Sequence, residues 1–529
     1  MFRSISGRSQ NYLLPKLKNY EPLLFTFSVN KTQFQKPKFF SQLNDIQSSQ
    51  NDSLSRHIKQ KILATGPITI SEYIKMALTS PLGGYYTKTD IFGHSGDFVT
   101  SPEISQMFGE VIALWYIMQW EAKNYPKNIE FIELGPGKGT LIEDILRASK
   151  RFPKFIESIK CIHLIETSPT LRNQQAIKLA DVNSPEFMAQ KFDKKCLDTI
   201  QTCPSKYPNI DIKWYADIES LSLKNSDSVA MIMAHEFFDA LPIHRFELGE
   251  FGWSEILVDI AENDKPTNII ANTKTLDSVK NSEYKDATLQ NPNVEWYRSP
   301  TQSKSIGSEN KTPDLVNVDD QFETSENLEF KFVKTKKPTI NSTAYLNLDK
   351  FKSVFEKGDS IEISPQSAVI SQKLAKLVNE TNGVALIVDY GKDYTQSSTF
   401  RGVSKHKFVN PLLRPGTIDL TADVDFSYLK ESINPIANTF GPVEQQHFLH
   451  QMGIQARLQQ LLKIAKTTDV QKDLIASYQR LTDPAAMGKI YKFLAIKPKN
   501  DTNPPVSFDL PEKVPQKVTK YTSQSIKKD

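Results

Sequence analysis

Five short apolar runs recur between residues 131 and 390, and they predict the strands of one sheet. They are FIEL (131–134), CIHLIE (161–166), IKWYAD (212–217), VAMIMA (229–234) and ALIVDY (385–390). Helical segments lie between several of these runs, and this alternation is typical of a doubly wound α/β sheet. Ligands of such sheets bind beyond the carboxyl ends of the strands, so the residues that follow each run are the candidates for chemistry.

Helices are predicted where apolar residues recur at helical spacing. The segment TISEYIKMALTSP (69–81) opens with a capping pattern, Thr69 followed by Glu72, and continues as an amphipathic helix. The segments ISQMFGEVIALWYIMQWEAK (104–123) and SPQSAVISQKLAKLVNET (364–381) predict two further helices, the first of them largely buried.

The two ends of the chain differ from its middle. Up to Ser41 the chain holds seven basic residues against one acid, Glu21, and residues 1–45 are predicted to be a disordered mitochondrial presequence. A basic tail without a targeting function is the alternative. Residues 498–529 are rich in Lys, Pro and Ser and predict a disordered tail.

A polar segment at 262–340 divides the folded part of the chain. It is predicted to be a partly disordered insertion, with short strands near Val294–Tyr297 and Phe330–Val333. Residues 55–260 then contain the N-terminal helices and the first part of the α/β domain. Residues 341–497 contain the remainder of that domain and helical additions.

Composition excludes several classes of function. The net charge is only +4 over 529 residues, and no basic stripe predicts nucleic-acid binding. The three cysteines have no C-x-x-C spacing, which disfavours a disulfide framework or a zinc site. No apolar stretch is long enough for a transmembrane segment. The pattern does not predict an oligomeric state.

The turn after the first run has the residues of a ligand-binding loop. In EFIELGPGKGT, Glu133 lies in the apolar run and Gly135, Gly137 and Gly139 follow at alternate positions before a helix. Glycines allow close approach of a ligand, and a helix start offers free N–H groups. The spacing differs from the dinucleotide fingerprint G-x-G-x-x-G and resembles the first motif of class I methyltransferases that use S-adenosylmethionine. A glycine turn without a ligand is the alternative.

Acids stand at the ends of three further runs. Glu166 is placed to accept hydrogen bonds from ribose hydroxyls, and Asp217 to receive an adenine amino group. After the fourth run, AHEFFDALP brings His235, Glu236 and Asp239 within five positions. Carboxylates there could orient a guanidinium and accept the proton lost when nitrogen is methylated. Acids that only satisfy a helix dipole are the alternative.

Several longer motifs make a resemblance specific. They are SPLGGYY (80–86), GDFVTSPEIS (96–105), ELGPGKGTL (133–141), HEFFDALP (235–242), VDYG (388–391), LRPGTIDLTADVDF (413–426) and FLHQMGI (448–454). With these motifs the chain resembles the MidA/NDUFAF-type family of mitochondrial protein arginine methyltransferases, assembly factors of respiratory complex I.

The resemblance implies a class I methyltransferase fold, a Rossmann-like seven-stranded sheet with additional, mostly helical segments, and S-adenosylmethionine as cofactor. It implies symmetric dimethylation of an arginine in the 49-kDa-type subunit of complex I, in the mitochondrial matrix. Glu133, Gly135, Gly137, Gly139 and Glu166 would bind the cofactor. Thr100, Ser101 and Glu103 would close over it, and Glu236 and Asp239 would face the arginine. The alternatives are a non-catalytic complex I assembly chaperone that keeps the fold, and a methyltransferase of another substrate.

Two further clusters permit more than one interpretation. Asp419, Asp423 and Asp425 alternate with apolar residues in TADVDF, as in a strand with one polar face. They could contact a metal or a basic substrate, or form a solvated strand or turn. His447 and His450 lack a third ligand nearby, so no metal site is predicted.

Overall fold

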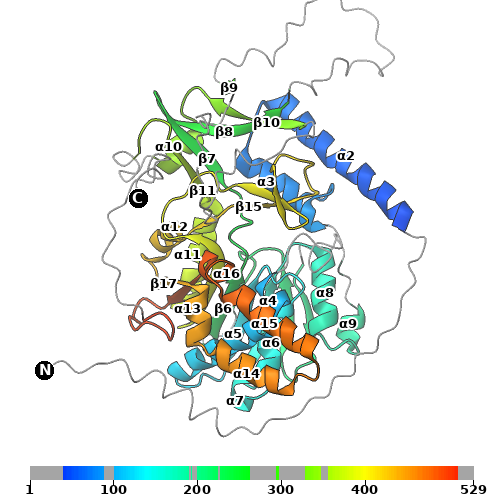
Figure 1. The fold of residues 1–529 in the computed structure, drawn as a ribbon, viewed down its shortest axis with the longest axis vertical. Coiled ribbons are helices and arrows are strands. Elements are labelled where there is room, and N and C mark those ends of the chain that lie inside the picture. The colour runs from blue at the N-terminus through cyan, green and yellow to red at the C-terminus, as the bar shows by residue number, and fades with distance from the viewer. Residues whose placement is uncertain are drawn as a thin grey trace, which may run out of the picture. The chain divides into compact units, whose positions relative to one another are not determined.

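The computed structural model describes residues 40–87, 100–189, 192, 199–223, 227–261, 294–296, 328–346 and 355–509, with side chains for all of these except 40–52 and 294–296. Residues 49–529 form one compact unit, and Met1–Ser48 form another, of which only the start of helix α2 (Phe40–Thr65) is described. The fold below is that of the larger unit (Figure 1). Most of the predicted presequence and of the predicted C-terminal tail lies outside the described residues.

The main sheet contains nine strands in the described part of the chain. Its order is β17 (Asn438–Glu444), β18 (Tyr491–Lys497), β12 (Val384–Lys392), β6 (Val229–His235), β2 (Ile129–Leu134), β3 (Ile159–Ile165), β5 (Asp211–Tyr215) and β4 (Gln201–Pro204), while β16 (Val424–Asp425) pairs with the end of β12. The five central strands from β12 to β5 are parallel, whereas β18 and β4 run antiparallel to their neighbours. All five predicted strands are confirmed, and they lie side by side.

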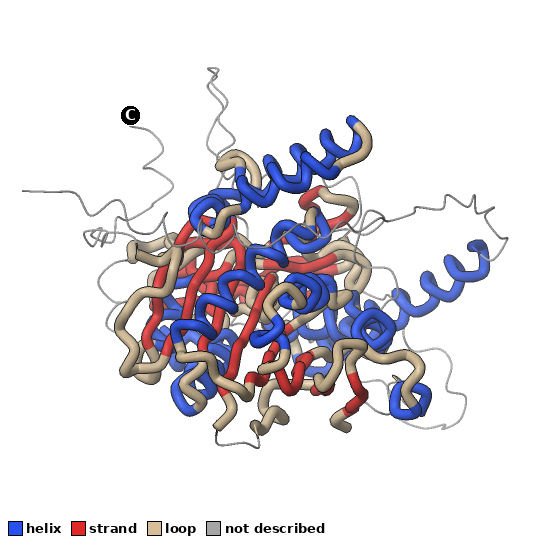
Figure 2. Tube along the Cα trace, turned by 90° about the horizontal axis from the view of Figure 1, so that it is seen from below, coloured by secondary structure: helices blue, strands red, loops and turns tan. Residues whose placement is uncertain are grey.

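Helices cover both faces of this sheet (Figure 2). Side chains alternate between the faces, so that Met231 and Met233 join one apolar core while Ile232 between them joins the other. The first core includes residues of α5 (Gln106–Ala122), α6 (Thr140–Ser149), α7 (Pro153–Ile156), α8 (Pro169–Leu179), α13 (Gln445–Gln451) and α14 (Ile454–Ile464). The second includes residues of α11 (Pro365–Glu380) and α12 (Phe426–Ile433). The doubly wound architecture is therefore confirmed.

A second, antiparallel sheet was not expected from the sequence. Its order is β11 (Ser360–Ile363), β7 (His244–Gly249), β8 (Gly252–Ile260), β10 (Phe330–Thr335) and β9 (Val294–Trp296), with β1 (Ile68–Thr69) also paired to β8. The additions to the core are thus both strands and helices, where the sequence predicted mostly helices. The pairing is hard to foresee because β8 forms a hairpin with β7 but takes its other two partners, β1 and β10, from distant segments of the chain.

The polar segment predicted as an insertion begins just beyond β8. Ile260 at the end of β8 pairs with Phe330 at the start of β10, so the two strands meet as they would in a hairpin. The short strands predicted near Val294–Tyr297 and Phe330–Val333 are confirmed as β9 and β10. Residues 262–293 and 297–327 lie outside the described residues.

Helix α3 (Ile70–Thr79) connects this second sheet to the site. Its capping box is present, since the Thr69 hydroxyl accepts from the Glu72 N–H at 3.0 Å and the Glu72 carboxylate accepts from the Thr69 N–H at 3.3 Å. Its buried face packs in an apolar cluster with β8 and β10. The remaining described elements are η1 (Tyr85–Thr87), α4 (Ser101–Ile104), α9 (Pro185–Ala189), α10 (Ile340–Leu346), β13 (Arg401–Ser404), β14 (Lys407–Val409), β15 (Asp419–Thr421), α15 (Thr468–Thr482) and α16 (Met487–Ile490).

Candidate active site

The glycine loop after β2 adopts a backbone conformation that favours glycine. Gly135, Gly137 and Gly139 have φ angles of 61°, 52° and 72°, in the left-handed region. A Cβ on Gly135 would lie 3.0 Å from Cδ2 of Phe237, which is closer than normal packing allows. Gly139 is the N-cap of α6, so the loop leads directly into a helix N-terminus. The predicted strand, glycine turn and helix are all confirmed.

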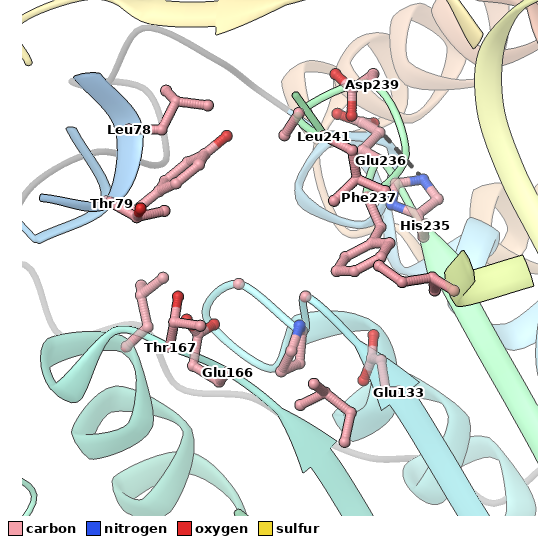
Figure 3. Close-up of a pocket in the computed structure, with 18 of the residues that line it drawn as sticks. Leu78, Thr79, Glu133, Glu166, Thr167, His235, Glu236, Phe237, Asp239 and Leu241 are labelled. Atoms are coloured by element: carbon pink, nitrogen blue, oxygen red, sulfur yellow. Dashed lines mark ion pairs between the residues drawn. The ribbon is translucent and has the colours of Figure 1, made fainter. Parts of the chain in front are cut away.

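A cavity of about 590 Å³ opens beyond the carboxyl ends of β2, β3, β5 and β6 (Figure 3). Nine of the eleven predicted site residues line it: Thr100, Glu103, Glu133, Gly135, Gly137, Glu166, Asp217, Glu236 and Asp239. Ser101 and Gly139 lie just behind its wall. Helix α3 contributes Leu78 and Thr79, which Figure 3 shows across the cavity from Glu236 and Asp239.

Two acids lie on the glycine-loop side of the cavity. Glu133 is 3% exposed, and burial raises its pKa to about 8. Burial also raises the pKa of Glu166 to about 7, although its carboxylate accepts from the Ser168 N–H at 2.8 Å and from the Gln175 amide at 3.2 Å. Gln175 also donates to the Gly137 carbonyl at 2.7 Å, so it ties the glycine loop to the acid that follows β3.

Asp217 lines the cavity two residues beyond β5, as predicted. One of its oxygens accepts from both the N–H and the hydroxyl of Ser220, at 2.8 and 2.9 Å. Asp217 therefore also stabilises the turn that follows its strand, a role that the sequence did not indicate.

The motif around α4 approaches the glycine loop from the other side. Glu103 lies 3.7 Å from the Lys138 ammonium, between Gly137 and Gly139, which places α4 against the loop. The Ser101 side chain is fully buried, and its backbone N–H is within hydrogen-bonding reach of the Glu236 carboxylate. Ser101 thus contacts the site through its main chain.

The turn after β6 holds the two acids predicted to face a substrate. Burial raises the pKa of Glu236 to about 8 and also raises the pKa of Asp239. Glu236 has a φ of 48°, which is unusual for a residue with a side chain and is often found at functional sites. Sequence reasoning found these acids but not the residue that holds their turn.

That residue is Asp389 in β12, which is 0% exposed. Its Oδ2 accepts from three consecutive N–H groups of the turn, those of Phe237, Phe238 and Asp239, at 3.2, 3.0 and 3.3 Å. The sequence did contain a signal for Asp389, which is an acid inside the apolar run ALIVDY. A carboxylate buried in such a strand needs several hydrogen-bond donors, so it is expected to hold neighbouring N–H groups.

Buried polar atoms without a hydrogen-bond partner gather at this cavity. Among the described residues they include Ser101 Oγ, Glu103 Oε2, Glu133 Oε2, His235 Nε2, Glu236 Oε1 and Asp239 Oδ1. Most of these atoms are carboxylate oxygens, which in the ionised state can accept hydrogen bonds but cannot donate them. Burial lowers the pKa of His235 to about 3, so this ring adds no positive charge. When its carboxylates are ionised, a ligand that satisfies the site must bring hydrogen-bond donors or positive charge.

The aspartates of TADVDF do not form one strand. The segment divides into β15 and β16, which belong to different sheets. Asp423 forms an ion pair with Arg401 at 2.7 Å, and Asp425 caps α12 through the Tyr428 N–H at 2.9 Å. Asp419 alone lines the cavity, where it accepts from the Tyr86 hydroxyl at 3.1 Å. The segment is therefore not one continuous strand, because residues 422–423 lie between β15 and β16 and belong to neither.

Hydrogen bonds account for two of the histidines that could suggest a metal, His163 and His450. Glu130, Cys161 and His163 lie together, but the two ring nitrogens of His163 contact Glu130 at 2.7 Å and Tyr215 at 3.0 Å. The ring of His450 is likewise held by the Gln446 carbonyl and the Tyr478 hydroxyl. We assign no metal to either group.

Comparisons with known proteins agree with this geometry. Residues 111–443 match the family described as "Putative S-adenosyl-L-methionine-dependent methyltransferase". The chain is 34% identical over 472 residues to a Xenopus tropicalis protein named "Protein arginine methyltransferase NDUFAF7, mitochondrial", covering 87% of this chain and 90% of that protein. It is 32% identical over 462 residues to the Homo sapiens protein of the same name, covering 87% of each.

A solved structure shares the fold. It is a Burkholderia thailandensis protein bound to S-adenosyl-homocysteine, which is 18% identical, with a TM-score of 0.59 and coverage of 88% of this chain and 96% of that one. At this identity the likeness concerns the fold alone. In the part of this chain that is described, no helix is both long enough and apolar enough to cross a membrane.

Proposed function

The chain belongs to the family of S-adenosylmethionine-dependent methyltransferases that these relatives represent, and from that premise we propose that it methylates arginine in a protein. The observation that carries the proposal is the set of unpaired carboxylate oxygens around the cavity. A guanidinium brings five N–H donors and a permanent positive charge, which is what such a wall lacks.

The residues present fit the cofactor. The left-handed glycines leave the loop without side chains where a ligand approaches, and α6 begins at its end. Glu166 follows β3, where it can accept from ribose hydroxyls, and Glu133 adds a buried carboxylate beside the loop. When bound, S-adenosylmethionine supplies a methyl group attached to a sulfonium sulfur.

The acids after β6 would then bind and deprotonate the acceptor. Glu236 and Asp239 would hold the guanidinium so that one nitrogen points toward the glycine-loop side of the cavity. On methylation that nitrogen would have to lose a proton, and a carboxylate oxygen of Glu236 or Asp239 would accept it. A guanidinium is a very weak acid, so the proton leaves late, when the nitrogen has already gained the methyl group.

Finer assignments of product, substrate, compartment and chain organisation complete the proposal. The product would be symmetric dimethylarginine, and the substrate the 49-kDa-type subunit of complex I. The named relatives are mitochondrial, and we assign this chain to the mitochondrion and, within it, to the matrix. Residues 1–45 would be its presequence, and 262–340 an insertion into the methyltransferase domain.

The test compares mitochondria that lack this protein with mitochondria complemented by the wild type or by Glu236→Gln. Mass spectrometry of the complex I subunits should find symmetric dimethylarginine only with the wild type. The Gln variant should still bind S-adenosylmethionine with unchanged affinity in calorimetry, because it alters only the acceptor side.

Each other outcome has a distinct meaning. Methylation restored by Glu236→Gln would remove the catalytic role of this acid. Assembly of complex I restored without methylation would favour a non-catalytic chaperone. Methylarginine of another type, or on another protein, would correct the product or the target.

A further inference from the structure

Two tyrosines face each other on neighbouring strands next to the acid pair. Tyr390 in β12 and Tyr491, the first residue of β18, are register partners in the antiparallel pairing. Their ring centroids lie 5.5 Å apart in an edge-on arrangement. Neither was predicted as a site residue, and neither lines the cavity.

Tyr390 holds one oxygen of Asp239. Its hydroxyl donates to Oδ2, and the Thr421 hydroxyl donates to the same oxygen at 2.9 Å. The other oxygen, Oδ1, is buried and has no hydrogen-bond partner among the described residues. Asp239 is therefore fixed at one oxygen and open at the other.

Tyr491 lies beside Glu236. Burial is the larger cause of both pKa shifts, but the two side chains are close enough to affect each other as well: Tyr491 lowers the pKa of Glu236, and Glu236 raises that of Tyr491. Within the described structure Glu236 Oε1 again lacks a hydrogen-bond partner. Burial and the nearby acids raise the pKa of both tyrosines, so both hydroxyls remain protonated and able to donate.

Resting on the proposed function, we propose that Tyr390 and Tyr491 are a pair of positioning residues, one for each acid. The register of β12 and β18 places the two rings against each other, with the Tyr390 hydroxyl on one oxygen of Asp239 and Tyr491 close to Glu236. One open oxygen per acid then remains for the substrate. Two separate acceptors suit a planar cation with N–H groups on different nitrogens, as a guanidinium has, better than a single ammonium.

The test uses Tyr390→Phe and Tyr491→Phe in the full chain, with an arginine-containing substrate peptide. Loss of a hydrogen bond to an ionised group should lower kcat/KM roughly tenfold to a hundredfold in each variant. The affinity for S-adenosylhomocysteine in calorimetry should stay within about twofold, because neither hydroxyl lies on the cofactor side. The acidic limb of the kcat/KM profile should move to higher pH, since removing a donor raises the pKa of the acid.

A matched control separates positioning from packing. Tyr73 is also fully buried, and its hydroxyl donates to the Pro411 carbonyl at 3.1 Å, away from the acids. Tyr73→Phe should leave the acidic limb where it is in the wild type. If a tyrosine variant fails to fold, Thr421→Val removes the second donor to the same oxygen of Asp239, and Thr421→Ser, which keeps the hydroxyl, should show the smaller shift.

Failure of this inference differs from failure of the proposed function. If the wild type methylates arginine and both tyrosine variants match it in rate and pH profile, the positioning role is wrong. An equal loss at every pH together with a lowered melting temperature would also overturn it, since that result shows packing alone. If the wild type does not methylate arginine, the proposed function fails first.

Discussion

At the scale of single residues, the site depends on backbone conformations that most side chains disfavour. On one wall Gly135 has a φ of 61°, and on the other Glu236 has a φ of 48°. A left-handed conformation costs a residue with a Cβ about 1–2 kcal/mol. Asp389 accepts hydrogen bonds from three N–H groups of the turn that follows Glu236. These bonds stabilise the turn and offset this cost.

The substitution Gly135→Ala tests the cofactor wall. The new Cβ would lie 3.0 Å from the Phe237 ring and would carry the left-handed strain as well, so we expect the affinity for S-adenosylmethionine to fall at least about tenfold. Gly358→Ala is the control, because Gly358 has a φ of 96° with nothing near its Cβ. Calorimetry on both variants should show loss only for Gly135→Ala, and equal affinities would exclude the loop as the binding site.

The positions of the site residues were predictable from the sequence where a strand end marks them. Glu133, Glu166, Glu236 and Asp239 all follow from the rule that ligands bind beyond the carboxyl ends of strands. Tyr390 and Thr421 could not be found this way. Their hydroxyls meet at Asp239 only because β12 and β15 converge there, and no local pattern records that convergence.

At the scale of elements, the helices and strands that could be predicted were those marked by residues close together in the sequence. The capping box of α3 and the five parallel strands of the main sheet are marked by residues close together in the sequence, and both were predicted. In the second sheet β9 and β10 were predicted, whereas β7, β8 and β11 were not. These three strands are partly polar, and β8 pairs with the distant strands β1 and β10.

The hairpin-like pairing of β8 with β10 allows a deletion to be designed. Ile260 pairs with Phe330, and the Ala261 N–H donates to the Glu329 carbonyl at 2.9 Å. Replacing residues 262–327 by a short Asn-Gly turn removes the three-residue edge strand β9 but should leave β8 and β10 paired with each other. We expect the melting temperature and the affinity for S-adenosylmethionine to stay close to those of the full chain.

A second deletion serves as control for that experiment. Removing β10 as well, from 262 through 335, takes away one of the partners of β8. It also deletes the buried apolar side chains of Phe330 and Val333. This variant should aggregate, or should have a lower melting temperature than the full chain. If the shorter deletion is equally damaging, residues 262–327 contribute to the fold.

At the scale of the whole molecule, the buried acids predict how stability depends on pH. Burial raises the pKa of Glu133 and Glu236 to about 8 and that of Glu166 to about 7, from an ordinary value of 4.5. The folded chain thus retains protons that the unfolded chain releases. This contribution to stability is complete below pH 4.5 and is lost as the pH rises through 7 to 8.

The free energy of unfolding of the cofactor-free protein should therefore fall as the pH rises from neutral to mildly alkaline. Urea unfolding at constant ionic strength measures it. Glu133→Gln and Glu236→Gln should each make the dependence shallower, because the amide cannot release a proton. Stability that rises over this range, or variants with the slope of the wild type, would contradict the assignment.

The position of β18 has a consequence for the order in which the chain is made. Among the described strands it is the last along the chain, yet it lies between β12 and β17, which are both synthesised earlier. A nascent polypeptide that has emerged only as far as β17 already contains the glycine loop, Glu166 and both acids. It still has a gap in its sheet and lacks Tyr491. Translation must therefore reach the last described strand before the acid pair is complete, and a chain cut short there carries a cofactor loop without a finished substrate wall.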